Sequence, residues 1–364
     1  MSRLDLVGKL YQNTVWPSAK KVAEGGRLPA PLVVDLDPTT FCDLACPECI
    51  SATVLNQGRF TKERLASLAG ELCTAGTRAV VLIGGGEPLA HPGTRDAIEI
   101  LGSSGLHVGV VTNGTMIDRH LDVIAEHATW LRVSVDAATE DTYGQVRPDR
   151  KGRSVFDKVI ANMRALVQVK TGTVGYSFLL VTRFDDAGRV IYSNHGEVLA
   201  AARLAKDIGC DYFELKTMFD EQHFVVQLPD DMLESVREQM AQVRELRDDS
   251  FDVELSSTFT SAENRRPTQQ VKAYCTCPVA QLRTLVTPSG VYICSYHRGN
   301  DRARLGDAVE EDFADLWKKA DLTVINPSRD CKFHCARHQT NDEIMDMAAL
   351  PENPYPREEF DRFL

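Results

Sequence analysis

The stretch Cys42-Asp-Leu-Ala-Cys46-Pro-Glu-Cys49 determines how the rest of this sequence is interpreted. Its three cysteines follow an expected strand, 32–37, and have the spacing C-x3-C-x2-C. The 364 residues contain ten cysteines, and clustering of this kind is typical of metal or cluster ligands. A second group lies nearer the C-terminus and consists of Cys275, Cys277, Cys294, Cys331 and Cys335. The two remaining cysteines, Cys73 and Cys210, belong to neither group.

The three-cysteine spacing favours an iron–sulfur cluster over a zinc ion. Three thiolates leave one iron of a four-iron cluster without a protein ligand, so that this iron is open to bind a substrate. A structural zinc site would instead need four protein ligands in a closed tetrahedron. No fourth cysteine lies close to Cys42, Cys46 and Cys49, so we expect a cluster with one open iron.

Between residues 32 and 217 the sequence alternates strand and helix patterns. This alternation predicts an α/β fold with a parallel sheet and right-handed crossovers. The expected strands are 32–37, 79–84, 107–112, 131–136, 174–181 and 211–216, and the expected helices are 61–75, 93–103, 117–127, 155–167 and 196–208.

The pattern changes after residue 217, where a polar helical stretch at 230–247 is followed by a charged, Ser/Thr-rich region. We therefore expect five parts along the chain. They are an N-terminal extension at 1–30, a catalytic domain at 31–217, a helical linker at 218–266, a small cysteine-rich domain at 267–340 and a tail at 341–364.

Composition and charge narrow the class of protein. A net charge of −11 disfavours a nucleic-acid partner, because phosphate repels an acidic protein. No apolar run reaches the roughly 18 residues of a membrane helix, and the segment MSRLDLVGKLYQ does not resemble a signal peptide. The sequence therefore predicts a cytoplasmic protein without a membrane partner. Disulfides are rare in the cytoplasm, so we do not expect them here.

Polar residues alternate with apolar ones along three of the expected strands. Since side chains of a strand point alternately to opposite faces, Arg132, Ser134 and Asp136 share one face of the fourth strand. The same alternation puts Tyr212, Glu214 and Lys216 on one face of the sixth strand, and Asp35 and Asp37 on one face of the first. We expect Tyr212, Glu214 and Lys216 to be catalytic. A structural ion pair between Glu214 and Lys216 is the alternative.

The cysteine spacing, the segment Gly84-Gly85-Gly86-Glu87 and the polar fourth strand together resemble the radical S-adenosylmethionine (SAM) superfamily. The resemblance implies a partial (β/α)6 TIM-type barrel. It also implies that Cys42, Cys46 and Cys49 hold a [4Fe-4S] cluster whose open iron binds SAM, and that an electron donor such as flavodoxin or ferredoxin starts the reaction. A 5′-deoxyadenosyl radical then results. Glu48 departs from the family pattern, which usually has an aromatic adenine contact at that position.

The same resemblance implies a set of SAM-binding residues. In the family, the backbone of the Gly-Gly-Glu segment binds the SAM ammonium, and residues of the fourth strand lie near the ribose and carboxylate. Arg147 is a candidate for the carboxylate, because a guanidinium matches it bidentately, and a surface arginine is the alternative. The implied residues are Gly84, Gly85, Gly86, Glu87, Asn113, Ser134, Asp136 and Arg147.

The C-terminal cysteines resemble the SPASM/twitch extension of radical SAM enzymes, which carries auxiliary clusters. Five cysteines are too few for two clusters, so the resemblance implies one auxiliary iron–sulfur cluster, with [4Fe-4S] as the expected type. Its expected ligands are Cys277, Cys294, Cys331 and Cys335, with Cys275 as a substitute for Cys277. A zinc site is the alternative, because four thiolates also bind zinc.

Twitch-type relatives oxidise or epimerise sugars and aminocyclitols, as in aminoglycoside biosynthesis, so the resemblance predicts a small-molecule substrate. We expect hydrogen abstraction from a hydroxyl-bearing carbon, removal of the hydroxyl proton by a base, and transfer of an electron to the auxiliary cluster. Epimerisation and dehydration begin with the same abstraction, and an epimerase would need a thiol hydrogen donor such as Cys210 or Cys275. A peptide maturase without a recognition domain is the remaining alternative.

Overall fold

The computed structural model describes residues 4–220, 222–267 and 269–363. The chain divides into two compact units. The first contains the residues up to 41, 56–109 and those from 270 onward, and the second contains 42–55 and 110–269. The boundary at residue 109 lies within strand β3 (His107–Thr112).

The first unit has a mixed group of strands around β1 (Val33–Leu36). Strand β1 pairs in parallel with β2 (Ala79–Leu82) on one side and with β10 (Arg283–Thr287) on the other. Strands β11 (Gly290–Tyr292) and β12 (Arg304–Gly306) continue the group in antiparallel fashion. The order β12-β11-β10-β1-β2 therefore joins the C-terminal segment to the first strand of the chain.

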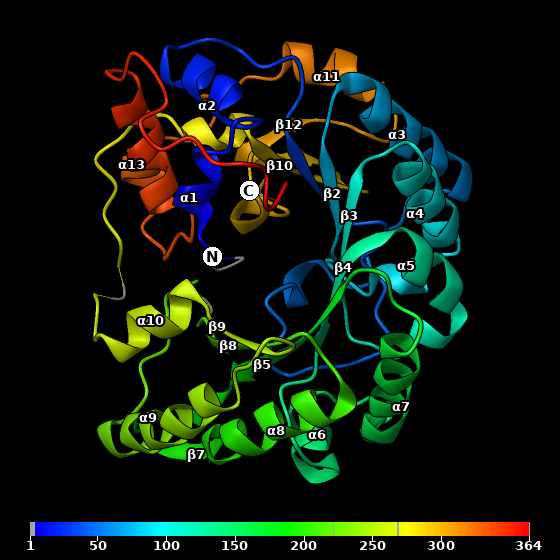
Figure 1. Cartoon of the computed structure of the whole chain (residues 1–364), viewed down its shortest axis with the longest axis vertical. Helices are drawn as coiled ribbons and strands as arrows, with labels where there is room; N and C mark the ends of the chain where they lie inside the picture. The colour runs from blue at the N-terminus through cyan, green and yellow to red at the C-terminus, as the bar shows by residue number, and fades with distance from the viewer. Residues whose placement is uncertain (1–3, 221, 268, 364) are drawn as a thin grey trace. The chain divides into compact units, whose positions relative to one another are not determined.

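Seven helices accompany these strands among the residues that the structure describes. They are α1 (Leu6–Leu10), α2 (Trp16–Ala23), α3 (Lys62–Ala75), α4 (Thr94–Ser103), α11 (Phe313–Lys319), α12 (Pro327–Asp330) and α13 (His338–Met347). Helices α3 and α4 lie side by side, as Figure 1 shows.

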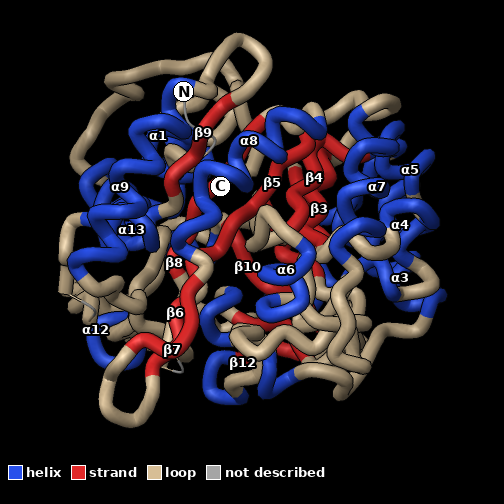
Figure 2. The backbone as a smooth tube through the Cα atoms, turned by 90° about the horizontal axis from the view of Figure 1, so that it is seen from below, coloured by secondary structure: helices blue, strands red, loops and turns tan. Residues whose placement is uncertain are grey.

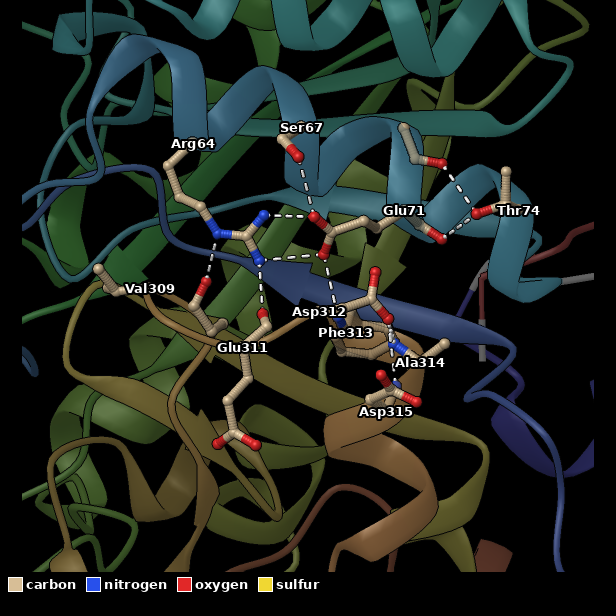
Figure 3. A network of polar contacts seen from close by, with 12 residues as sticks. Arg64, Ser67, Glu71, Thr74, Val309, Glu311, Asp312, Phe313, Ala314 and Asp315 are labelled. Carbon is tan, nitrogen blue, oxygen red and sulfur yellow. Dashed lines mark hydrogen bonds and ion pairs between the residues drawn. The ribbon is translucent and has the colours of Figure 1, made fainter.

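A polar network ties α3 to the C-terminal segment (Figure 3). Arg64 binds the carboxylate of Glu71 and donates to the backbone carbonyl of Glu311 at 2.8 Å. Glu71 in turn accepts the backbone N–H of Phe313, the first residue of α11, at 2.9 Å. These bonds fix α11 against α3.

The second unit has four parallel strands in the order β4-β5-β8-β9. They are β4 (Ala128–Ser134), β5 (Thr173–Leu180), β8 (Tyr212–Thr217) and β9 (Asp252–Leu255). A separate antiparallel hairpin consists of β6 (Thr182–Phe184) and β7 (Val190–Ser193), and Figure 2 shows the two strands with their connecting loop. The helices of this unit are α5 (Leu121–His127), α6 (Glu140–Val146), α7 (Phe156–Val167), α8 (Val198–Ile208), α9 (Asp230–Glu245) and α10 (Ser257–Glu263).

Local sequence signals set the helix ends. Thr61 caps α3 by accepting the backbone N–H of Arg64 at 3.0 Å, which satisfies one of the free donors of the first turn. Helices α3 and α8 both end at a glycine in the left-handed conformation, Gly76 (φ 95°) and Gly209 (φ 94°). The strands between such helices are apolar and buried, as in β1 and β2.

The structure confirms the predicted α/β class with a parallel-sheet core, which is consistent with a partial TIM-type barrel. Each of the six expected strands is present, as β1, β2, β3, β4, β5 and β8. Strand β9 was not predicted, and it extends the parallel strands into the segment expected to be a helical linker. The expected domain boundaries stay a prediction. Within the described residues, no helix has both the length and the apolar character needed to cross a membrane.

Candidate active site

The three N-terminal cysteines lie on a loop of the second unit that contacts the segment after α6. Ala45 donates its backbone N–H to the carbonyl of Pro148 at 2.8 Å. Arg150 donates from Nε to the carbonyl of Cys42, also at 2.8 Å. All three thiols are partly buried. The loop is therefore held by backbone and guanidinium contacts.

Two polar side chains approach these sulfur atoms. Arg147 Nη1 lies 3.9 Å from the Sγ of Cys46, and Asn113 Nδ2 lies 3.8 Å from the Sγ of Cys42. Burial raises the pKa of Cys46 to about 11, although the charge of Arg147 acts in the opposite direction. N–H donors directed at sulfur favour the thiolate that a metal cluster requires.

Asp136 organises the end of β4. Its φ of 59° is uncommon for a non-glycine residue, and its Oδ1 accepts the backbone N–H of Leu179 at 2.7 Å. Its Oδ2 accepts from Arg147 Nε at 2.6 Å and from Nη2 at 2.5 Å. Arg147 is therefore not a surface arginine, and the Nε–Nη2 edge of its guanidinium is already occupied by Asp136. Ser134 ends β4 opposite Ser177 of β5.

The sequence-predicted catalytic residues occupy β8, next to β5. Glu214 is buried and forms an ion pair with Arg132 of β4 at 2.9 Å, so its partner is not Lys216 as the alternative supposed. Burial alone would raise the pKa of Glu214, but the charges of Arg132 and Lys216 outweigh burial and lower it. Burial and the charge of Arg132 lower the pKa of Lys216 to about 8. The ring of Tyr212 lies over Gly175 of β5, where a Cβ would collide with it.

The glycine-rich segment of the first unit packs against the backbone that leads into the cysteine loop. A Cβ on Gly86 would lie 2.3 Å from the carbonyl oxygen of Phe41, so only glycine fits there. Glu87 donates its backbone N–H to the same carbonyl at 2.8 Å. The carboxylate of Glu87 is buried and accepts the N–H of Leu89 at 3.0 Å, and it thereby caps a short 3₁₀ turn. The Glu87 carboxylate is thus engaged in a local cap.

The C-terminal cysteines of the first unit gather around one cavity. Four of them line it, together with Lys272, Arg283 and Arg337; the four are Cys277, Cys294, Cys331 and Cys335. Burial raises the pKa of all four thiols, and neighbouring cysteines raise it further for Cys277, Cys294 and Cys331. Four thiolates in such a place need a metal centre to offset their charge, so the donor set fits an auxiliary cluster.

The remaining cysteines differ from these in position. Cys275 is exposed and does not line the cavity, which makes Cys277 the better fourth donor. Cys210 is buried just before the start of β8, at the opposite end of that strand from Thr217. Burial raises its pKa to about 12. Among the described residues, no three Cys, His, Asp or Glu side chains converge closely enough to hold a single metal ion.

Residues 36–189 match the family model of the radical SAM superfamily. This region, which is less than half of the chain, is thus similar to a radical SAM domain. The family uses SAM and a [4Fe-4S] cluster, which confirms the cofactors predicted from the sequence.

Two curated relatives resemble the radical SAM domain. The GTP 3′,8-cyclase of Synechocystis sp. is 32% identical over 145 residues, which are 37% of this chain and 43% of that protein. The AdoMet-dependent heme synthase of Methanosarcina barkeri is 27% identical over 141 residues, which are 38% of this chain and 39% of that protein. The chain thus spans about two fifths of the length of these relatives.

Solved structures match over a larger part of the chain. Streptococcus suis SuiB bound to the precursor peptide SuiA has a TM-score of 0.61 and 15% identity, and the match covers 85% of this chain and 68% of that chain. Native anSMEcpe with bound AdoMet has a TM-score of 0.59 and 15% identity, covering 87% of this chain and 97% of that chain. At such identities the two matches show the fold alone. Both cover a larger part of this chain than residues 36–189.

The partners of several polar residues were not predicted from the sequence. Glu48 binds Arg183 of the β6–β7 hairpin, with Nη2 at 3.0 Å from Oε2, and the guanidinium lies over the Tyr192 ring. In the first unit, Asp35 of β1 and Asp37, which directly follows this strand, each bind an arginine of the C-terminal segment. No local pattern marks such partners, because they are distant in sequence.

Proposed function

We propose that this chain is a radical SAM enzyme that oxidises a hydroxyl-bearing carbon of a sugar or aminocyclitol-like molecule. The observation that carries the proposal is the cavity lined by Cys277, Cys294, Cys331 and Cys335, because an oxidation of this kind needs an electron acceptor beyond the SAM cluster. Cys42, Cys46 and Cys49 would hold the [4Fe-4S] cluster. When bound, SAM and its cluster supply the 5′-deoxyadenosyl radical, and the auxiliary cluster accepts an electron.

The residues around SAM take roles that fit their contacts. The backbone of Gly84–Glu87 would accept the SAM ammonium. Asn113 and Arg147 stabilise the cysteine thiolates through the contacts described above. Asp136 holds Arg147 in that position, and Ser134 is left at the end of β4 to meet the ribose or carboxylate.

Lys216 is the best candidate for the base that removes the hydroxyl proton. Its lowered pKa of about 8 allows a neutral amine near physiological pH. Glu214 is instead held as an anion by Arg132, so we assign it to positioning Arg132 and Lys216 rather than to proton transfer. Tyr212 would line the substrate space beside them.

Two other outcomes remain as alternatives. Epimerisation or dehydration would start from the same hydrogen abstraction, but Cys210 is poorly placed as a hydrogen donor because it is buried just before β8, at the opposite end of that strand from Thr217. A peptide maturase is favoured by the fold match to SuiB, whose structure holds a precursor peptide.

We infer a cytoplasmic enzyme reduced by a flavodoxin- or ferredoxin-type donor.

The proposal is tested with anaerobically reconstituted full-length protein, SAM and dithionite. We expect 5′-deoxyadenosine to form, and a triple Cys42→Ala, Cys46→Ala, Cys49→Ala variant to form none. A panel of aminocyclitols, sugars and Cys- or Ser-containing peptides is then scored by mass spectrometry. A ketone two mass units lighter than a polyol substrate supports the proposal. A modified peptide with unmodified polyols would favour the maturase instead.

A further inference from the structure

Two buried carboxylates, Asp35 in β1 and Asp37 directly after it, are bound by arginines that stand on either side of Cys294 in the sequence. Arg298 donates two hydrogen bonds to the Asp37 carboxyl group, from Nε to Oδ2 at 2.6 Å and from Nη2 to Oδ1 at 3.0 Å. Arg283 grips Asp35 in the same manner, with Nη2 2.5 Å from Oδ1. The Asp37 side chain is fully buried, so its charge depends on Arg298 for compensation.

Asp37 also holds the glycine-rich segment. Its Oδ2 accepts the backbone N–H of Gly85 at 3.0 Å. Because a trans peptide is planar, fixing this N–H also fixes the Gly84 carbonyl, which points the opposite way. An ammonium group has only donors and needs acceptors of this kind. Asp37 therefore sets the orientation of one acceptor in the segment that we propose binds SAM.

At the other end, Arg298 is placed by the cysteine cavity. It follows directly after a 3₁₀ turn, Ser295–His297, that begins at Cys294. The Nε2 of the buried His297 lies 3.3 Å from the Sγ of Cys331, and its ring contacts Phe333 edge-on. The turn that carries Arg298 is thus held between two of the proposed auxiliary ligands.

We propose that the Asp37–Arg298 pair is a positioning device through which the auxiliary cysteine site sets the affinity for SAM. The inference rests on the proposed function of the glycine-rich segment. Filling the cavity fixes the 295–297 turn, the turn places Arg298, and the two bonds from Arg298 hold the Asp37 carboxyl group where it accepts the N–H of Gly85. Asp37 and Arg298 act through this backbone and do not themselves take part in the reaction.

The test measures SAM binding by anaerobic equilibrium dialysis of the reconstituted full-length protein, without reductant, so that no turnover is needed. We expect Arg298→Met to weaken SAM binding about tenfold, or about 1.4 kcal/mol, with the iron content of the first cluster unchanged. Arg298→Lys should recover part of this loss, because it restores the charge without the two-bond geometry. Cys331→Ala should weaken SAM binding in the same direction.

A double variant and a surface control separate coupling from damage to the fold. Asp37→Asn with Arg298→Met leaves no unpaired buried charge, and it should bind SAM no worse than either single variant, because the pair acts as one unit. Arg304→Met removes the partly exposed ion pair between Arg304 and Asp307, which lies in the same C-terminal segment as Arg298. This control should leave the affinity for SAM unchanged.

Each result gives a clear decision. Unchanged SAM affinity in Arg298→Met, or an equal loss in Arg304→Met, would overturn the coupling while leaving the proposed function intact. Wild-type protein that holds iron but binds no SAM would instead refute the proposed function itself. A loss confined to Asp37, Arg298 and Cys331 variants supports the inference.

Discussion

Two cysteines that stand two residues apart give the sharpest test of the auxiliary site. Cys277 lines the cavity with three other thiols, whereas Cys275 is exposed and lies outside its lining. Wild-type protein with two four-iron clusters should contain about eight irons per chain. Cys277→Ala removes one of four ligands and should lower this to about four. Cys275→Ala removes none and should keep about eight.

The assay is anaerobic reconstitution, removal of free iron, and measurement of iron, sulfide and zinc on the same samples. Electron paramagnetic resonance of the dithionite-reduced protein should show two overlapping cluster signals in Cys275→Ala and one in Cys277→Ala. Equal iron loss in both variants would refute the ligand assignment. About four irons plus one zinc in the wild type would show that the cavity binds zinc instead.

Three further outcomes test the other parts of the site. Gly86→Ala should destabilise the protein by about 1–3 kcal/mol and lower the iron content of the first cluster, because the added Cβ would lie 2.3 Å from a backbone oxygen. Gly70→Ala is the control in thermal melts, since a Cβ there has nothing within 4 Å, and equal melting temperatures would contradict the packing argument. Glu48→Gln should lower stability by about 1–2 kcal/mol, since it leaves a partly buried Arg183 without its charged partner, and chemical unfolding that is unchanged would count against the pair. Once a substrate is identified, the rate of product formation should rise about tenfold between about pH 7 and about pH 9, because the Lys216 amine, with a pKa of about 8, becomes neutral as pH increases. The same pH profile in Lys216→Met would exclude Lys216 as the base.

Local sequence patterns were sufficient to predict the parallel core. Each expected strand and helix between residues 32 and 217 is present, because periodicity and caps such as Thr61 and Gly209 act within a few residues. Cysteine spacing likewise identified the groups that the structure brings together. The lining of one cavity by four cysteines between 277 and 335 agrees with the expected ligand set, which remains a proposal.

Pairings over long sequence separations could not be predicted in this way. Strand β10 was not expected beside β1, since the two are separated by more than two hundred residues and neither pattern identifies its neighbour. The consequence for the site is large. Asp35 and Asp37 were expected to share one face of the first strand, whereas β10 and the segment after Cys294 supply arginines that bind both.

The same relation recurs in both units, each taken by itself. Five carboxylates close to the proposed cofactor and substrate residues are each bound by an arginine: Asp35 by Arg283, Asp37 by Arg298, Glu48 by Arg183, Asp136 by Arg147 and Glu214 by Arg132. Burial alone would raise the pKa of Glu214, but the charges of Arg132 and Lys216 lower it and hold this acid as an anion. A carboxylate held in that way is a weak base. We therefore retain Lys216 as the proposed base, because burial and the charge of Arg132 lower the pKa of its amine to about 8.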